Sequence, residues 1–244
     1  MVSSRPVGGY HSDGAFDRFV ALLDSVEDYY TTGVRRPEAE RTRLMPPPAA
    51  APAPLGVEEA LAQVAAEVAV CQVCCLCQTR TNTVPGEGVS QPRVMVIGEG
   101  PGRDEDLSGR PFVGAAGKYL DRWLAAIDMD RGRNAYIANV VKCRPPNNRD
   151  PAPDESAACL PYLRRQVAAL RPPALLSVGR IASQLLTGSS VGIGAMRGQV
   201  YSFQPDDGTP IPLVVTYHPS GVLRNPQLRG SVWDDLRTLQ RIVA

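Results

Sequence analysis

The stretch RVMVIGEGPG, residues 93–102, joins a compact apolar run to a turn rich in glycine. A short apolar run that stops at a glycine is typical of a strand buried on both faces. Comparable runs occur in AYIANVV (135–141), ALLSVG (174–179) and LVVTYHP (213–219). We therefore expect these four runs to be the strands of one sheet.

Segments with helical character lie before, between and after these strands. Apolar spacing, composition and start signals such as Pro153 predict helices over residues 57–70, 114–128, from 153 onward, after the third strand to about 186, and over 230–243. Strands that alternate with helices predict an α/β fold, with a mainly parallel four-stranded sheet covered on both faces. The segments 99–112 and 142–152 are expected to be loops.

The first part of the chain has a different composition. Residues 16–30 have the apolar spacing of a helix, whereas residues 46–54, PPPAAAPAP, form a Pro/Ala linker that favours an extended conformation. The sequence therefore predicts an N-terminal extension over residues 1–54, partly disordered, and a folded domain over residues 55–244.

Composition restricts the class of protein. Hydrophobic residues make up 43% of the 244 residues, enough for a substantial core, and the net charge of +1 does not by itself indicate a partner. No apolar run is long enough to span a bilayer, and the first residues lack the layout of a secretory signal. The expectation is a cytoplasmic protein without a membrane anchor.

The ends of the predicted strands carry the most unusual residues. In parallel sheets, ligands bind at the carboxyl ends of the strands. These ends read GEGPG (98–102), NVVKC (139–143), SVG (177–179) and YHPSG (217–221). The glycines suggest close approach of the backbone to a ligand. Dinucleotide binding is the rival interpretation, but Pro101 lacks an N–H group that a phosphate loop would use.

Six cysteines occur, and four of them lie within residues 71–77. Without a secretory signal, this crowding indicates metal or cluster ligation rather than disulfides. Cys71 and Cys74 form a C-x2-C pair that combines naturally with Cys143 and Cys159. The spacing fits either a zinc ion or an iron–sulfur cluster. The neighbouring Cys75 and Cys77 are expected to be free thiols.

Three long segments resemble a known family. GEGPGRDEDLSGRPFVGAAGKYLD (98–121), NVVKCRPPNNRDPAPDESAAC (139–159) and HPSGVLRNP (218–226) are similar to the motifs of family 4 uracil-DNA glycosylases. The resemblance covers about residues 66–243. It implies a three-layer α/β/α fold and a structural [4Fe–4S] cluster held by Cys71, Cys74, Cys143 and Cys159. It also implies hydrolysis of the N-glycosidic bond of uracil in DNA, a step of base excision repair.

Within this resemblance, the strand-end residues acquire roles. Phe112 would stack on the flipped uracil, and the Asn139 amide would pair with its O4 and N3–H edge. His218 would donate a hydrogen bond to O2 as negative charge develops there, and the Gly100 amide would also contact the base. Glu99 is the carboxylate expected near the sugar.

Other acidic residues of the first loop are given smaller roles. Asp106 is the alternative to Glu99, or a cap of the following turn. Asp104 and Glu105 are expected to be solvated charges. Lys142 as a Schiff-base nucleophile would make the protein a lyase, but no paired base is visible in the sequence. We therefore expect a hydrolytic glycosylase.

Further residues are predicted to contact DNA, whether single- or double-stranded. Leu223 would enter the space left by the base, and Arg224, Arg144 and Arg149 would contact phosphates. Ser220-Gly221 replaces the Ala-Tyr that is usual in the family, which bears on the shape of this loop. No inserted basic segment with a histidine follows Lys142, which argues against covalent trapping of DNA.

Two alternatives stay open from the sequence alone. One is an iron–sulfur protein that binds nucleic acid without catalysis, and the other is a structural zinc protein. A monomer that acts on DNA in the nucleoid is the expected working form.

Overall fold

The computed structural model describes residues 56–206 and 208–244. The chain divides into two units between Pro54 and Leu55, and the second unit is described below. The helix expected over residues 16–30 and the linker at 46–54 lie outside the described residues. The domain boundary and the nature of the extension therefore stay predictions.

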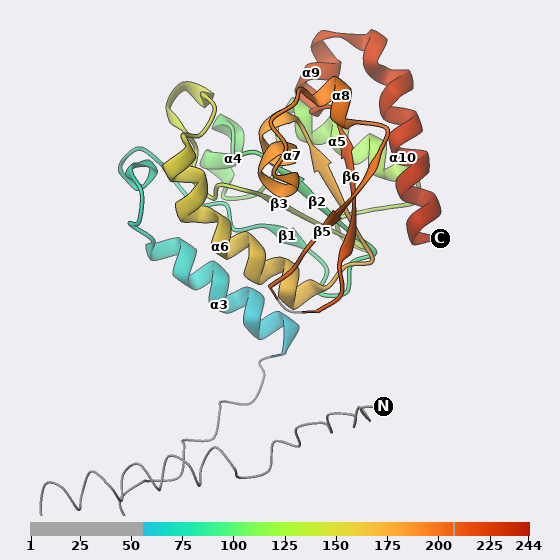
Figure 1. Ribbon diagram of the computed structural model, residues 1–244. Helices are drawn as coiled ribbons and strands as arrows, with labels where there is room; N and C mark the ends of the chain where they lie inside the picture. Colours follow the sequence, from blue (N-terminus) through green and yellow to red (C-terminus); the bar gives the residue numbers. More distant parts are fainter. Residues whose placement is uncertain (1–55, 207) are drawn as a thin grey trace, which may run out of the picture. The chain divides into compact units, whose positions relative to one another are not determined.

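A six-stranded sheet forms the centre of this unit, in the order β1-β3-β2-β4-β6-β5 (Figure 1). Its strands are β1 (Glu87–Gly88), β2 (Val94–Gly98), β3 (Ala135–Asn139), β4 (Ala174–Val178), β5 (Val200–Phe203) and β6 (Ile211–Thr216). The four predicted strands are the central ones and run parallel, which confirms the α/β class. The two edge strands, which pair antiparallel, were not predicted, so the four-stranded sheet is a correction.

The α-helices of the described residues are α3 (Val57–Val70), α4 (Arg103–Ser108), α5 (Ala115–Ala126), α6 (Pro153–Leu170), α7 (Arg180–Thr187), α8 (Ile193–Met196), α9 (Pro219–Arg224) and α10 (Arg229–Val243). All five predicted helices of the domain are present. The prediction of a continuous loop over residues 99–112 is wrong, because its acidic segment forms α4. Within the described residues, no helix combines the length and hydropathy of a membrane span.

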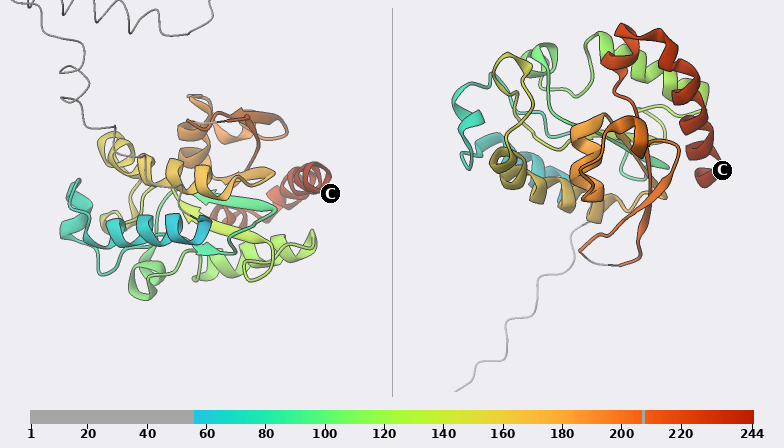
Figure 2. Two further views of the ribbon diagram at one scale, coloured as in Figure 1. Left: turned by 90° about the horizontal axis from the view of Figure 1, so that it is seen from below. Right: turned by 45° about the horizontal axis from the view of Figure 1, so that its top comes forward.

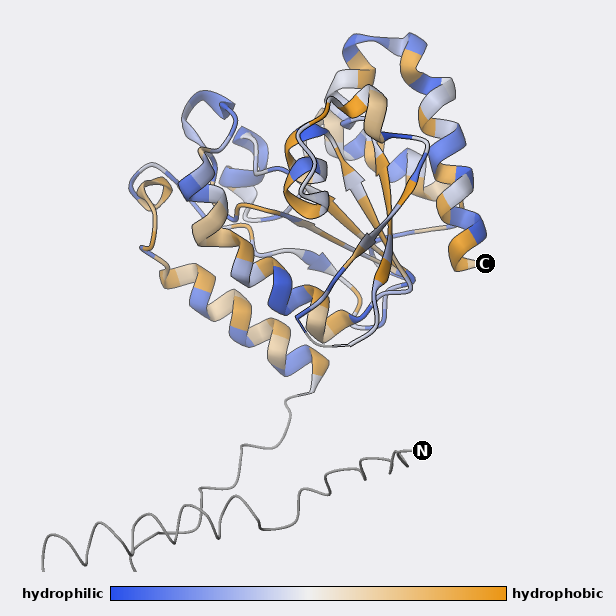
Figure 3. Ribbon diagram, in the orientation of Figure 1, coloured by the Kyte–Doolittle hydropathy of each residue, from blue (hydrophilic) through white to orange (hydrophobic). Residues whose placement is uncertain are grey.

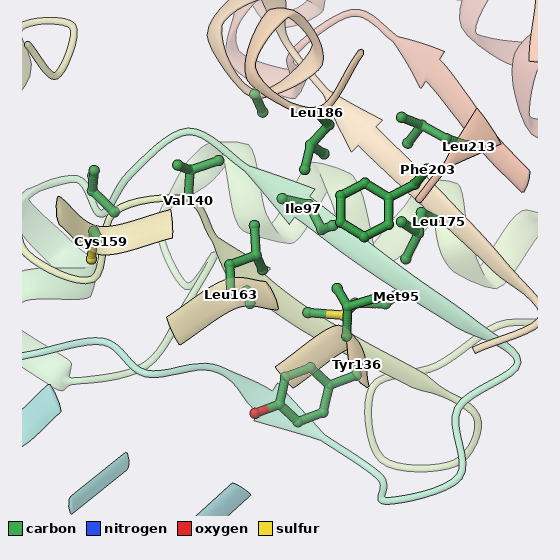
Figure 4. Packing of buried hydrophobic residues seen from close by; sticks show 14 of the residues in the cluster. Met95, Ile97, Tyr136, Val140, Cys159, Leu163, Leu175, Leu186, Phe203 and Leu213 are labelled. Atoms are coloured by element: carbon green, nitrogen blue, oxygen red, sulfur yellow. The ribbon is translucent and has the colours of Figure 1, made fainter. Parts of the chain in front are cut away.

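Two clusters of buried side chains, one on each face of the sheet, hold three layers together. Helices α6, α7 and α8 pack on one face, and α5, α9 and α10 on the other (Figure 2). Hydrophobic residues accordingly concentrate in the strands, whereas α10 alternates between polar and apolar residues along its length (Figure 3). On the α6 face, Met95 and Leu175 from the sheet pack in one cluster with Leu163, and Cys159 lies at the edge of that cluster (Figure 4).

One buried ion pair ties α10 to the rest of the domain. Arg197 donates from Nε and Nη2 to the two carboxylate oxygens of Asp235, at 3.0 and 2.7 Å. Thr216 at the end of β6 donates to the same carboxylate at 2.7 Å. The Asp235 side chain is 1% exposed, so these partners, rather than water, form the hydrogen bonds of its carboxylate.

Candidate active site and cysteine pocket

A cavity of about 620 Å3 opens at the carboxyl ends of the parallel strands. This is the edge where an α/β sheet of this kind binds ligands, and the volume suits a small molecule. Seven of the predicted site residues line it, namely Glu99, Gly100, Phe112, Asn139, Arg149, His218 and Arg224. Residues from four separate loops thus meet in one place.

The floor of the cavity is formed where Asn139 and Phe112 close over Gly98. A Cβ atom on Gly98 would lie 2.5 Å from Asn139 Oδ1 and 2.5 Å from Phe112 Cζ, so only glycine fits here. Asn139 is 1% exposed, and its Oδ1 has no hydrogen-bond partner in the described part of the chain. Because buried polar atoms are nearly always paired, an unpaired acceptor in a cavity wall is suited to a ligand that donates a hydrogen bond.

Phe112 is held in an unusual backbone conformation, with φ of 52°. Its carbonyl group lies where a Cβ atom on residue 117 would be, 1.9 Å away, and Gly117 leaves that space free. Arg131 donates to the carbonyl oxygens of Pro111 and Phe112, both at 2.9 Å. Since a non-glycine residue at positive φ is strained, these contacts fix the ring against the cavity in advance of any ligand.

Glu105 completes this arrangement and was wrongly predicted to be a solvated charge. Its carboxylate accepts hydrogen bonds from the backbone N–H groups of Gly102, Val113 and Gly114, at 3.1, 2.8 and 3.0 Å. It therefore joins the glycine-rich turn after β2 to the segment that carries Phe112. The signal was present in the sequence, because an acid three residues after a helix N-cap is the pattern of a capping box.

Asp106 lies away from the cavity. It is 3% exposed and accepts hydrogen bonds from the N–H groups of Thr81 and Asn82, at 2.9 and 3.3 Å. Its contacts are those of a structural residue that holds the chain between the cysteines and β1. The partners of its carboxylate precede it in the chain, so the expected cap of the following turn is wrong. Glu99, the carboxylate that the resemblance favours, does line the cavity.

His218 lies beside Phe112, with 5.8 Å between the ring centroids. The backbone N–H of Ser220 donates to His218 Nδ1 at 3.2 Å, and the Ser220 hydroxyl lies 2.8 Å from the same atom. An N–H group can only donate, so Nδ1 accepts and the proton of the neutral ring is on Nε2. Burial, with a smaller contribution from Arg224, lowers the pKa of His218 to about 4. The ring is therefore a neutral hydrogen-bond donor at physiological pH.

Glu99 occupies the wall on the β2 side. Burial, together with the negative charge of Asp150, raises the pKa of Glu99 to about 7, and Arg180 opposes this shift. Asp150 and Arg180 themselves form an ion pair of 2.6 Å in the wall of the cavity. Glu99 thus changes its charge near neutral pH, which is the range in which a carboxylate can act as a general base.

The cavity wall carries several arginines, and sequence reasoning had singled out only some of them. Arg103 and Arg180 line the cavity in addition to the predicted Arg149 and Arg224. Their shared signal is a position within a few residues of a strand end. Guanidinium groups at the mouth of a cleft suit a ligand that carries phosphates.

Arg149 has a structural contact as well, because it forms an ion pair of 2.6 Å with Glu155, whose side chain is 1% exposed. The predicted Arg144 and Leu223 are not part of the cavity lining. Arg144 donates to Asn148 Oδ1 at 2.7 Å, and Leu223 is 43% exposed on α9.

A second pocket collects cysteines from three regions of the chain. It is lined by Cys71, Cys74, Cys77, Cys143 and Cys159, and all of these are free thiols. Two positively charged residues, Arg80 and Lys142, also line it. Arg80 donates to Cys143 Sγ at 3.1 Å, and the backbone N–H of Lys142 donates to Cys159 Sγ at 3.2 Å. Cys75 lies outside the lining and donates to Glu155 Oε1 at 3.1 Å.

The donor set of this pocket fits an iron–sulfur cluster. Thiolates are its ligands, and N–H groups directed at sulfur are its usual surroundings. In the described residues, no three His, Cys, Asp or Glu side chains are arranged around a single metal ion. A cluster is wider than one ion, so its ligating sulfurs are more widely separated than those of a zinc site.

Lys142 is not positioned as a nucleophile. Its side chain is 1% exposed, and its Nζ donates to Asn139 O and Gln166 Oε1, both at 2.7 Å. It lines the cysteine pocket and not the strand-end cavity. The contacts agree with the expectation that this lysine does not form a Schiff base.

A match to a protein family identifies the class to which this chain belongs. The family model described as the uracil DNA glycosylase superfamily matches residues 85–237. This range includes all three motifs quoted above. The match therefore spans both the cavity and two of the pocket cysteines.

Individual relatives narrow this class. The chain is 43% identical over 185 residues to the type-4 uracil-DNA glycosylase of Archaeoglobus fulgidus, covering 74% of this chain and 92% of that protein. It is 44% identical to the protein of that name from Pyrobaculum aerophilum (68% of this chain, 86% of that one), and 39% identical to that from Thermotoga maritima (76% and 96%). The chain belongs to the type-4 uracil-DNA glycosylases.

Proposed function

We propose that this protein flips uracil out of DNA and hydrolyses its N-glycosidic bond, leaving an abasic site. The names of the type-4 relatives support this activity. The observation that carries it for this chain is the unpaired Oδ1 of Asn139, in a cavity that also holds the Phe112 ring and the neutral His218. We further propose that the protein acts as a monomer on DNA of the nucleoid.

Base selection follows from the Asn139 amide. Its Oδ1 accepts the N3–H of uracil and its Nδ2 donates to O4, while the base stacks on Phe112. Cytosine presents an acceptor at N3 and a donor at N4, so both contacts would fail. A cytosine in the cavity would leave buried polar groups without partners, at about 1–3 kcal/mol each.

Bond breaking makes an anionic uracil and a cationic sugar. The Nε2–H of His218 donates to uracil O2, where negative charge grows as the bond lengthens. Because the ring is already neutral, it can strengthen this hydrogen bond without first losing a proton. The Glu99 carboxylate stabilises the sugar cation or orients the attacking water. The Gly100 N–H supplies a further contact to the base.

The arginines at the cavity supply contacts to the DNA backbone. Arg224 on α9 and Arg149 after β3 both line the cavity and bind phosphates next to the flipped nucleotide. Leu223, exposed beside Arg224, enters the space that the base leaves in the stack, and Arg144 contacts the backbone farther along.

The cysteine pocket is proposed to hold a [4Fe–4S] cluster through Cys71, Cys74, Cys143 and Cys159. When bound, the cluster links the segment after α3, the segment after β3 and helix α6 through metal–sulfur bonds. The chain itself contributes the thiolates and the N–H groups of Arg80 and Lys142 that surround them.

Replacing Cys143 by Ser is expected to remove most of the absorbance near 400 nm and most of the bound iron, because a cluster site needs its thiolates. Cys75→Ser is the matched control and should retain both, since Cys75 lies outside the pocket lining. Iron content and the visible spectrum of the purified proteins measure this. A colourless wild-type protein loaded with zinc would contradict the cluster.

Asn139→Asp is expected to slow uracil release roughly ten- to hundredfold, because a carboxylate cannot donate to O4. The same change should raise the release of cytosine relative to uracil. Asn134→Asp is the control, since Asn134 precedes β3 at the opposite end of the strand. Release of each base from matched oligonucleotides is the measurement. Uracil release at the wild-type rate would remove Asn139 from the site.

The rate of uracil release should rise about tenfold between pH 6 and pH 8, because the ionised fraction of a group with a pKa of about 7 rises by that factor. The active form is the deprotonated Glu99, so activity is lost as pH falls. His218, with a pKa of about 4, stays neutral over this range. Glu99→Gln should be slow and independent of pH. A flat profile for the wild type would argue against Glu99 as the carboxylate in use.

Oligonucleotides with U·G, U·A or unpaired uracil test the activity as a whole. Release of free uracil by the purified protein, with loss of release in His218→Ala, is the expected result. Tight binding of DNA without release would instead favour the non-catalytic iron–sulfur binder.

A further inference from the structure

Lys142 stands between the cysteine pocket and the residue that reads the base. Its backbone N–H donates to Cys159 Sγ at 3.2 Å, and its Nζ donates to the backbone carbonyl of Asn139 at 2.7 Å. One residue therefore touches a proposed cluster ligand with its main chain and the base-reading strand end with its side chain. The Nζ contact with Asn139 plays no part in the mechanism above.

The charge of Lys142 lacks a visible partner. The side chain is 1% exposed, and no ion pair among the described residues includes it. Its two acceptors, Asn139 O and Gln166 Oε1, are neutral. An ammonium group is seldom buried without a negative charge nearby, so an adjacent anion would stabilise the charged form of Lys142. The cysteine pocket, which Lys142 lines, is the place for one, because a cluster held by four thiolates is anionic.

The Nζ contacts also restrict the position of Asn139. Gln166 is itself held, since its Nε2 donates to Pro85 O at 2.8 Å. The ammonium group therefore joins the end of β3 to a fixed residue of α6. The side chain of Asn139 starts from the backbone that this bridge holds, so its amide is aimed at the cavity by contacts behind it.

We propose that Lys142 is a positioning residue that serves as the buried counter-cation of the cluster and holds Asn139 in place for uracil. This rests on the proposed function. Lys142 contacts both the proposed cluster ligand Cys159 and the backbone of Asn139. A change in the cluster therefore affects the binding of uracil by Asn139. Arg80, which lines the same pocket and donates to Cys143 Sγ, provides a second positive charge.

The test uses the full-length protein with its cluster and three variants. Lys142→Met removes the charge and keeps the length of the side chain. Gln166→Leu removes one Nζ acceptor and keeps the charge. Lys118→Met is the control, because Lys118 is the other lysine of the sequence and is exposed on α5. The readouts are the reduction potential of the cluster, the decay of absorbance near 400 nm with an iron chelator in air, and single-turnover uracil release per cluster-loaded protein.

Lys142→Met is expected to shift the potential to a more negative value, and to speed cluster loss and slow uracil release about tenfold each. A positive charge favours the reduced cluster, so its removal lowers the potential. Gln166→Leu should slow release without moving the potential, and Lys118→Met should match wild type in all three. Wild-type potential or wild-type release in Lys142→Met would overturn the proposal.

If Lys142→Met fails to fold, Gln166→Glu decides the question. It places a carboxylate next to Nζ, neutralises the ammonium group and should also lower the potential, whereas an unchanged potential overturns the proposal. A wild-type protein that releases no uracil would refute the proposed function instead, which separates the two failures.

Discussion

Uracil release by a His218→Ala protein is expected to be about a hundred to a thousand times slower than by the wild type, because one preorganised donor at a developing anion is removed. The loss should appear in the chemical step, since the O2 contact strengthens only as the bond breaks. Single-turnover rates with saturating protein therefore measure it, and binding of uracil-containing DNA should change little.

His11→Ala is the natural control, because it removes the other histidine of the sequence. It should leave the rate unchanged. A second comparison uses pH, since the pKa of His218 of about 4 predicts that the ratio of the wild-type rate to the His218→Ala rate does not vary between pH 6 and 8. A rate that His218→Ala lowers by less than about fivefold would mean that another group stabilises the leaving base.

Arg197→Met is expected to lower the free energy of unfolding by about 3–5 kcal/mol, because it leaves the Asp235 carboxylate buried without its charge partner. The Thr216 hydroxyl would remain as a donor, but a single neutral hydrogen bond does not replace two charged ones. Chemical denaturation of the protein as purified is the measurement.

The matched control for this change is Arg133→Met. Arg133 also pairs with an aspartate, Asp128, but the two side chains are 60% and 79% exposed. Exposed pairs contribute at most about 1 kcal/mol, so this variant should unfold close to wild type. Equal stability of the two variants would show that burial of Asp235 does not decide the strength of its ion pair.

The central strands and the cavity at their ends could be predicted because both follow from local pattern. Apolar runs that end in glycine mark buried parallel strands, and such strands align their carboxyl ends. Glu99, Asn139 and His218 each lie at the carboxyl end of one of these strands, and they line one cavity. The edge strands β1 and β5 were not predicted, because they lack this apolar pattern. β1 has two residues, and β5 is partly exposed, with Val200 50% accessible, so neither has the apolar pattern of a buried strand.

The supports of the site were harder to predict, because they depend on contacts distant in sequence. Nothing near Phe112 indicates that Arg131 holds its carbonyl group, or that Gly117 must lack a side chain. Glu105 had a local signal, its position three residues after a helix N-cap, but that pattern does not indicate its contacts with the N–H groups of Val113 and Gly114. Lys142 was weighed as a nucleophile because lysine often is one, and its burial could not be read from its neighbours.

The fixed position of the Phe112 ring determines whether the protein or the DNA must change shape on binding. Arg131, Glu105 and Gly117 hold Phe112 in place before DNA arrives, so this wall has little freedom to adjust to its target. The DNA must therefore change its conformation instead. The free energy of unpairing and unstacking the base then opposes its entry into the cavity. A uracil that is mispaired or unpaired meets a lower barrier than one paired with adenine. Preference among lesions can therefore arise from the weakness of the helix around them, without any residue that inspects the opposite strand.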